Sequence, residues 1–299
     1  MINKSYKDQV SLLISVIPEI ARENCFALHG GTAINLFIRN MPRLSVDIDL
    51  TYIPIEDRAT TFKNINDALA RIKTHIEKVI PKVVISHKKA ALKLLISAGG
   101  VLVKLEVSQI NRGLLQAPLK MDLCEFAQDM FDAFCSISTM HSGQLYGGKI
   151  CAALDRQHPR DLFDIKDLLD QGGITEDIKT GFLLCLLASA RPIHELLSPN
   201  LLDQKIAMEN QFLGMTEDDF TYEEYEQTRN VLIKSIGESL SVQDKKFLTS
   251  FVATQPDWTI HDFEKFPSVQ WKLQNLQHLK ENNPEKHGAL LEALEEVLA

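Results

Sequence analysis

The sequence lacks the features of several large protein classes. No stretch approaches the roughly 20 uncharged apolar residues that a membrane-spanning helix needs, because the longest apolar run lies around 182–190 and is too short. The first ten residues, MINKSYKDQV, contain no apolar run of the kind found in signal peptides. With only 14 glycines and 11 prolines, the composition also excludes a fibrous chain. We therefore expect a globular protein with no membrane partner.

Cysteine is scarce as well. The five cysteines are widely scattered and no two of them form a C-x-x-C pair, so neither a zinc site nor a disulfide framework is predicted. A chain without disulfides fits a reducing compartment, and we expect the protein to be cytoplasmic.

Charge is distributed unevenly along the 299 residues. The formal net charge is −8, and most of the excess lies in residues 181–299, which contain 19 acidic and 10 basic residues. In contrast, residues 60–120 contain 11 basic and 3 acidic residues. Such a segment either forms solvated helix faces or marks a surface that binds a polyanion.

The hydrophobic periodicity changes along the chain. The first half mixes the two types of signal: helical spacing over 5–22, 33–39, 57–80, 141–156 and 159–171, and strand-like runs at 26–28, 45–52, 83–86, 91–97 and 101–110. From about residue 174 mostly helical signals follow, over 179–190, 193–202, 222–240, 241–253 and 285–298. The pattern predicts an α+β (mixed α/β) protein, with a mixed-sheet domain at 1–140 and a helical domain at 141–299.

Two carboxylates lie two residues apart in a predicted strand. Asp47 and Asp49 alternate with apolar residues, and a period of two places both side chains on the same face of a sheet. Two carboxylates together with substrate phosphates are a typical Mg²⁺ site. The alternative is that both aspartates simply face solvent.

A third acid, Glu106, lies in the alternating run VLVKLEVSQI. If its strand lies beside that of Asp47 and Asp49, three carboxylates can hold two cations, the arrangement used for in-line phosphoryl or nucleotidyl transfer. Taken alone, Glu106 is better explained as part of the polar face of an alternating strand.

Gly30, Gly31 and Thr32 precede a predicted helix. Glycines allow close approach of a ligand to the backbone, and the N–H groups at a helix N-terminus attract phosphate. The spacing matches neither a Walker P-loop nor the Rossmann fingerprint. A turn followed by a threonine cap is the alternative.

A later cluster contains Lys149, Asp161 and Asp164. Lys149 begins an apolar helix and could contact a triphosphate as a compact cation. Asp161 and Asp164 are three residues apart and share a helix face. Structural ion pairs among these residues are the alternative.

Together these segments resemble a known family. LHGGTAINLFIRNMPRLSVDIDL resembles the G-G-T … R-x-S-x-D-[IL]-D-[LF] signature of the AbiEii-type nucleotidyltransferase toxins, and LYGGKICAALDRQHPRDLFDI resembles that family's later lysine and R-D-[LF]-[YF]-D motif. VLVKLEVS stands where the family has an intervening strand that carries an acid. The three blocks span residues 26–170 in the family's order.

The resemblance implies a DNA-polymerase-β-like nucleotidyltransferase domain, followed by a helical domain that contributes Lys149 and Asp164 to the active-site cleft. It implies metal binding by Asp47, Asp49 and Glu106, and catalytic roles for these three residues and for Lys149 and Asp164. It also assigns nucleotide binding to Gly30, Gly31, Thr32, Ser45, Lys149 and Asp161.

The implied activity is Mg²⁺-dependent transfer of a nucleotide from an NTP to an acceptor, foremost the 3′ end of tRNA. Such a protein acts as the toxin of a bacterial toxin–antitoxin or phage-defence system, with a cognate antitoxin as a partner. Two alternatives remain: a small-molecule or protein acceptor, and a catalytically silent nucleotide-binding module.

Overall fold

The computed structural model describes residues 3–299, which form two compact units. The first unit extends to His141 and also includes Phe212–Asp219, whereas the second comprises Ser142–Gln211 and Phe220–Ala299. Residues 212–219, which the sequence-based division groups with the helical domain, therefore belong to the first unit.

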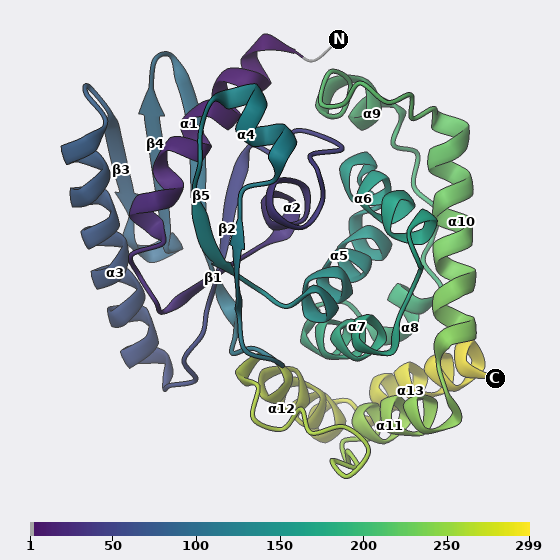
Figure 1. Ribbon diagram of the computed structural model, residues 1–299. Coiled ribbons are helices and arrows are strands. Elements are labelled where there is room, and N and C mark those ends of the chain that lie inside the picture. The colour runs from purple at the N-terminus through teal and green to yellow at the C-terminus, as the bar shows by residue number, and fades with distance from the viewer. Residues whose placement is uncertain (1–2) are drawn as a thin grey trace. The chain divides into compact units, whose positions relative to one another are not determined.

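A seven-stranded mixed sheet organises the first unit, in the order β3-β4-β5-β2-β1-β7-β6 (Figure 1). Strand β2 is antiparallel to β1 and parallel to β5. Strand β4 pairs antiparallel with β5 on one side and with β3 on the other. The strands are β1 (Phe26–His29), β2 (Asp47–Tyr52), β3 (Val84–Lys88), β4 (Lys93–Ala98), β5 (Val101–Arg112), β6 (Leu119–Asp122) and β7 (Ser136–Thr139).

Two long helices, α1 (Lys4–Ile20) and α3 (Arg58–Val79), pack against the sheet. The side chains of α3 that point inward are Ile65, Leu69, Ile72 and Ile76, and all are fully buried. On the strands every second residue is buried with them, namely Ile48, Leu50, Leu94, Ile96, Val103 and Leu105. Because side chains alternate along a strand, the residues between these positions lie on the opposite face.

Beside β1 and β2, the chain forms α2 (Gly30–Ala33) and η1, a π-helix over Ile34–Ile38. The loop that follows is held by the returning segment: Leu44 donates a backbone hydrogen bond to the Met215 carbonyl (2.7 Å), and the Thr216 hydroxyl donates to the Pro42 carbonyl (2.8 Å). A short helix, α4 (Glu125–Phe131), follows β6.

All the regular secondary structure of the second unit is helical. Its helices are α5 (Ser142–Arg156), α6 (Pro159–Asp170), α7 (Glu176–Ala188), α8 (Ile193–Leu197), α9 (Lys205–Gln211), α10 (Tyr222–Ser239), α11 (Val242–Val252), α12 (Pro267–Asn282) and α13 (Pro284–Leu298). Helices α5 and α7 lie in close contact along their length. Glycines make this approach possible, because a methyl group at Gly147 would overlap the backbone of Gly181 and Phe182.

The predicted fold class is confirmed: a mixed sheet with helices precedes a helical region. The sequence pattern missed the short strands β6 and β7 and the helices α4, α9 and α12. It also extended one helix to residue 202, whereas α8 ends at Leu197. The missed helices bury only one to three side chains each, so their hydrophobic periodicity is weak.

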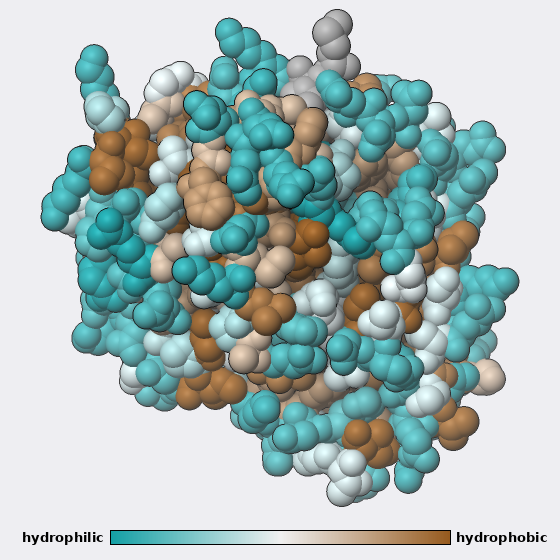
Figure 2. Space-filling model, viewed as in Figure 1, coloured by the Kyte–Doolittle hydropathy of each residue, from teal (hydrophilic) through white to brown (hydrophobic). Residues whose placement is uncertain are grey.

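None of the helices described in residues 3–299 is long and apolar enough to cross a membrane. The face shown in Figure 2 is mainly hydrophilic, with apolar side chains in several separate places. All five cysteines are free thiols. Burial raises the pKa of Cys151 to about 12, so this residue behaves as a small core side chain and not as a nucleophile.

The contact between α5 and α7 gives a stability prediction. Gly147→Ala should destabilise the protein by about 1–3 kcal/mol or more, since the backbones must separate. Gly237→Ala is the control: it lies in α10 with open space around it and should stabilise by up to about 1 kcal/mol through helix propensity. Urea denaturation of both variants measures the difference. Equal stabilities would contradict the packing argument.

Candidate active site

The carboxylates of β2 and β5 meet on one face of the sheet. In the parallel register, Asp49 lies directly opposite Glu106, and Asp47 lies directly opposite Lys104. Ile48 and Leu50 point to the other face and are fully buried, whereas Asp47 and Asp49 are half-buried. The three acids predicted from the sequence therefore line one surface of two neighbouring strands.

Basic residues adjoin these acids from the neighbouring strands. Lys93 of β4 forms an ion pair with Glu106, and the Lys104 ammonium lies 3.4 Å from the Asp47 carboxylate. On the other side, His29 of β1 is in register with Asp49. The two lysine ammonium groups offset the repulsion between carboxylates that stand on adjacent strands.

The donor set fits a Mg²⁺ ion that is shared with a substrate. Within residues 3–299, no group of three or more His, Cys, Asp or Glu side chains is gathered closely enough to hold a metal by itself. Mg²⁺ does not require such a cage, because it is commonly bound by one or two carboxylates plus substrate phosphates. Asp47 and Asp49 offer two carboxylates on one face for that purpose.

Gly30 gives Asp49 its space. Its φ is +73°, a conformation that side-chain-bearing residues rarely adopt. A Cβ atom at this position would lie 2.6 Å from Asp49 Oδ2. Glycine at position 30 thus permits the positive φ and also leaves room for the Asp49 carboxylate.

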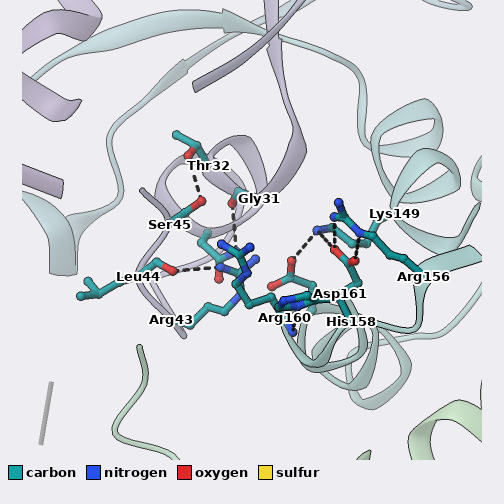
Figure 3. A network of polar contacts seen from close by, with 12 residues as sticks. Gly31, Thr32, Arg43, Leu44, Ser45, Lys149, Arg156, His158, Arg160 and Asp161 are labelled. Atoms are coloured by element: carbon teal, nitrogen blue, oxygen red, sulfur yellow. Dashed lines mark hydrogen bonds and ion pairs between the residues drawn. The ribbon is translucent and has the colours of Figure 1, made fainter. Parts of the chain in front are cut away.

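Gly31 accommodates a buried cation. A Cβ atom there would lie 2.8 Å from Arg43 Nη2 and 3.0 Å from Ser45 Oγ. Arg43 is only 3% exposed, and its Nη1 donates to the Leu44 carbonyl at 2.9 Å (Figure 3). The guanidinium therefore lies against the glycine turn, where it adds positive charge.

Thr32 joins the turn to the strand that carries the aspartates. Its hydroxyl donates to the Asp47 carbonyl oxygen at 2.5 Å and lies 2.9 Å from Ser45 Oγ (Figure 3). Thr32 and Ser45 are both buried. The predicted threonine cap is wrong, because Thr32 lies within α2 and the N-cap residue is His29. The Thr32 hydroxyl instead fixes the start of β2 relative to α2.

The second predicted cluster forms a buried charge network within the second unit. The Lys149 ammonium lies 2.9 Å from Asp161 Oδ1 and 2.8 Å from Asp164 Oδ2. All three residues are at least nine-tenths buried, and Arg156 adds a second cation with its Nε 2.6 Å from Asp161 Oδ2 (Figure 3). The spacing of Asp161 and Asp164 on α6 lets both carboxylates reach the same ammonium.

The pKa of Asp161 reflects this network. Burial by itself would raise the pKa of the Asp161 carboxyl, but the charges and hydrogen bonds of Lys149 and Arg156 outweigh burial, and the pKa lies well below its ordinary value. Asp161 is therefore an anion that holds two cations in place.

The turn between α5 and α6 is clamped from several sides. Gln157 has a φ of +48° and is 1% exposed. Its amide binds the Asn200 carbonyl (2.7 Å), and its own carbonyl accepts from the Tyr225 hydroxyl (2.8 Å). His158 Nδ1 then accepts the Arg160 N–H and caps α6. These contacts orient the first turn of α6, which carries Asp161.

Sequence reasoning missed several partners of the predicted residues. One partner, Lys93, could have been found from the sequence. The two-residue turn Gly99-Gly100, in which both residues have positive φ, fixes the register of β4 and β5. That register places Lys93 opposite Glu106. The others have no local signal, because Arg43 and Gln157 are recognisable only from their burial in the folded protein.

The geometry of the turn predicts different results for two glycines. Gly30→Ala should lose most nucleotide binding, because the new methyl group displaces the Asp49 carboxylate. Gly99→Ala, also at positive φ (+58°) but with open space around it, should incur a similar backbone cost of about 1 kcal/mol and bind nucleotide normally. Calorimetric titration with an NTP and Mg²⁺ measures both. Equal affinities for the two variants would refute the role of Gly30.

The low pKa of Asp161 predicts acid sensitivity of folding. A carboxyl with a folded pKa below its unfolded pKa contributes stability above the unfolded value and loses it as the pH falls below about 5. Asp161→Asn should lower the free energy of unfolding at neutral pH by about 3 kcal/mol and reduce its decline on acidification. Urea denaturation followed by circular dichroism at several pH values tests this, with the exposed Asp170→Asn as control. An unchanged pH slope in Asp161→Asn would contradict the network.

Comparisons with known proteins identify the family and the fold of this chain. The family model described as "Nucleotidyl transferase AbiEii toxin, Type IV TA system" matches residues 11–275. Among solved structures, MenT4, a nucleotidyltransferase toxin from Mycobacterium tuberculosis H37Rv, is similar with a TM-score of 0.64 and 10% sequence identity, covering 91% of this chain and 93% of that one. At this identity the similarity shows a shared fold. No curated protein matches this chain in sequence.

The matched region includes the glycine turn, the aspartates of β2, Glu106 and the lysine–aspartate cluster of the second unit. It covers most of the chain. The chain therefore belongs to the AbiEii family of nucleotidyltransferase toxins of type IV toxin–antitoxin systems.

Proposed function

We propose that this protein transfers a nucleotide from an NTP to an RNA acceptor, foremost the 3′ end of tRNA, in a Mg²⁺-dependent reaction. The observation that carries the proposal is the placement of Asp49 and Glu106 directly opposite each other on β2 and β5, with Asp47 on the same face. The glycine turn adjoins these acids, since a Cβ atom at Gly30 would lie 2.6 Å from Asp49 Oδ2.

In this proposal Asp47 and Asp49 would hold the Mg²⁺ ion. The ion supplies charge neutralisation for the triphosphate and lowers the pKa of a bound hydroxyl. The N–H groups at the start of α2 bind phosphate oxygens, and the nearby guanidinium of Arg43 adds positive charge. Glu106 accepts the proton of the attacking acceptor hydroxyl or positions that hydroxyl. The hydroxyl oxygen forms a bond to the α-phosphorus of the NTP as the bond to the β-phosphate breaks, and pyrophosphate leaves.

Lys149 keeps its predicted role as a cation for the triphosphate. Its two carboxylate partners, Asp161 and Asp164, position the ammonium and retain it in its charged form. Lys149→Met would remove the ammonium that the two buried carboxylates share, so a nucleotide-binding defect in this variant has to be separated from a folding defect.

An RNA acceptor is supported by charge. Residues 60–120 have eight more basic than acidic residues in an otherwise acidic protein, and basic surfaces bind phosphate backbones. Membership of a type IV family also implies a cognate antitoxin as a partner.

The test is a labelling experiment with the purified protein. It is incubated with Mg²⁺, total bacterial tRNA and each α-³²P-labelled NTP in turn. We expect label on tRNA with one preferred NTP, and no label with Asp49→Asn, because the altered residue keeps its shape and loses its charge. Asp122→Asn, an exposed acid on β6, is the control and should label tRNA at the wild-type level.

Other results would redirect the proposal. Mg²⁺-dependent NTP binding without label on RNA would favour a protein or small-molecule acceptor. Absence of NTP binding would favour the silent nucleotide-binding module, and full activity of Asp49→Asn would refute the proposed site.

A further inference from the structure

The strand register extends the acid pair into a row of charged side chains that crosses five strands. Lys88 of β3 lies opposite Lys93 of β4, Lys93 opposite Glu106 of β5, Glu106 opposite Asp49 of β2, and Asp49 opposite His29 of β1. A second row on the same face runs from Leu95 to Lys104 to Asp47. The face is thus cationic over β3 and β4 and anionic over β2. We refer to the three lysines of these two rows, Lys88, Lys93 and Lys104, together as the lysine row.

This face is accessible beside the acids. Helix α3 buries Ile85, Leu94 and Ile96, which point the other way, and His87 bonds to Asn66 of α3 on that same buried side. On the face of the lysine row, Val84 is 68% and Leu102 43% exposed. Lys88 and Lys104 are exposed as well, and the Lys93 side chain is 28% exposed.

The positive charges of the lysine row favour the binding of an anion. Lys88 and Lys93 are directly opposite each other, and like charges at opposed positions destabilise a sheet. Within the described part of the chain, Lys88 has no ion-pair partner. An anionic ligand lying across β3 and β4 would relieve this repulsion.

We propose that the lysine row binds the phosphate backbone of the acceptor RNA, with the acceptor hydroxyl directed toward Asp49 and Glu106. The proposal rests on the proposed function, because it places the acceptor of that reaction on the sheet. Lys88 and Asp49 are separated by three strand spacings, about 14 Å, so the row can guide the last few nucleotides of a strand toward the acids.

The ion pairs of Lys93 and Lys104 fit this role. They connect the lysine row to Glu106 and Asp47, the acids assigned to the reaction. Both pairs are partly exposed, and exposed ion pairs contribute little to stability. These lysines can therefore exchange a carboxylate for a phosphate at small cost.

The test compares two triple variants that remove the same charge from the basic segment. The first is Lys88→Met/Lys93→Met/Lys104→Met. The control is Lys63→Met/Lys73→Met/Lys78→Met, on α3 against the other face of the sheet, where two lysines form only exposed pairs with Asp67 and Glu77. Fluorescence anisotropy measures binding of a fluorescein-labelled RNA hairpin with a single-stranded 3′ tail at several salt concentrations, and circular dichroism confirms folding.

We expect the first variant to bind the hairpin more weakly, and the slope of log K against log salt to fall by about two, for three lost contacts with single-stranded phosphates. The control should keep the wild-type slope. Lys88→Met alone, which disturbs no ion pair, should lower the slope by somewhat less than one. Equal slopes for the two triple variants would overturn the proposal, and so would competition by polyglutamate as strong as that by unlabelled RNA.

Labelling of tRNA by the wild-type protein separates the two proposals. If the wild type labels tRNA and the lysine row has no effect on hairpin binding, the acceptor surface is wrong and the proposed function stands. If the lysine row controls binding and no label is transferred with any NTP, the surface stands and the proposed function fails.

Discussion

The mutual repulsion of carboxylates on β2 and β5 is the constraint on which the first unit's site depends. Asp49 and Glu106 stand directly opposite each other, and Asp47 is two residues from Asp49 on the same face. Like charges at such positions destabilise a sheet, so the surroundings have to supply positive charge. Lys93 and Lys104 do so from the neighbouring strand positions, and Gly30 leaves room for the Asp49 carboxylate. A cation shared with phosphates would complete this balance.

The second unit balances charge differently. Lys149, Asp161 and Asp164 are almost fully buried, and each charge is matched at short distance. Breaking a buried pair is costly because the remaining charge has no solvent, so the motif residues of α5 and α6 are also structural. Their positions depend on neutral features, namely the glycine contacts between α5 and α7 and the clamped turn at Gln157. Substitutions in this cluster therefore have to be assessed for stability before activity.

Much of the candidate site could be predicted from the sequence, because its signals are local. The alternation around Asp47 and Asp49 predicts that both side chains lie on one face of a strand. The Gly99-Gly100 turn fixes the strand register that places Lys93 opposite Glu106. The pairing of β5 with β2 could not be predicted, since parallel strands far apart in sequence carry no turn that sets their register. The same limit applies to Arg43, whose burial against Gly31 results from tertiary packing. The family resemblance implied what local patterns could not, namely a shared activity for these dispersed residues.

In the proposed function, the glycine turn and the aspartates of β2 form one nucleotide site. The most direct measurement is a crystal structure of the protein with Mn²⁺ and a non-hydrolysable NTP, in which anomalous scattering locates the metal. The account predicts a manganese peak at Asp47 and Asp49, with phosphate oxygens against the backbone N–H groups at the start of α2. A triphosphate bound elsewhere, or a manganese peak away from both aspartates, would contradict it.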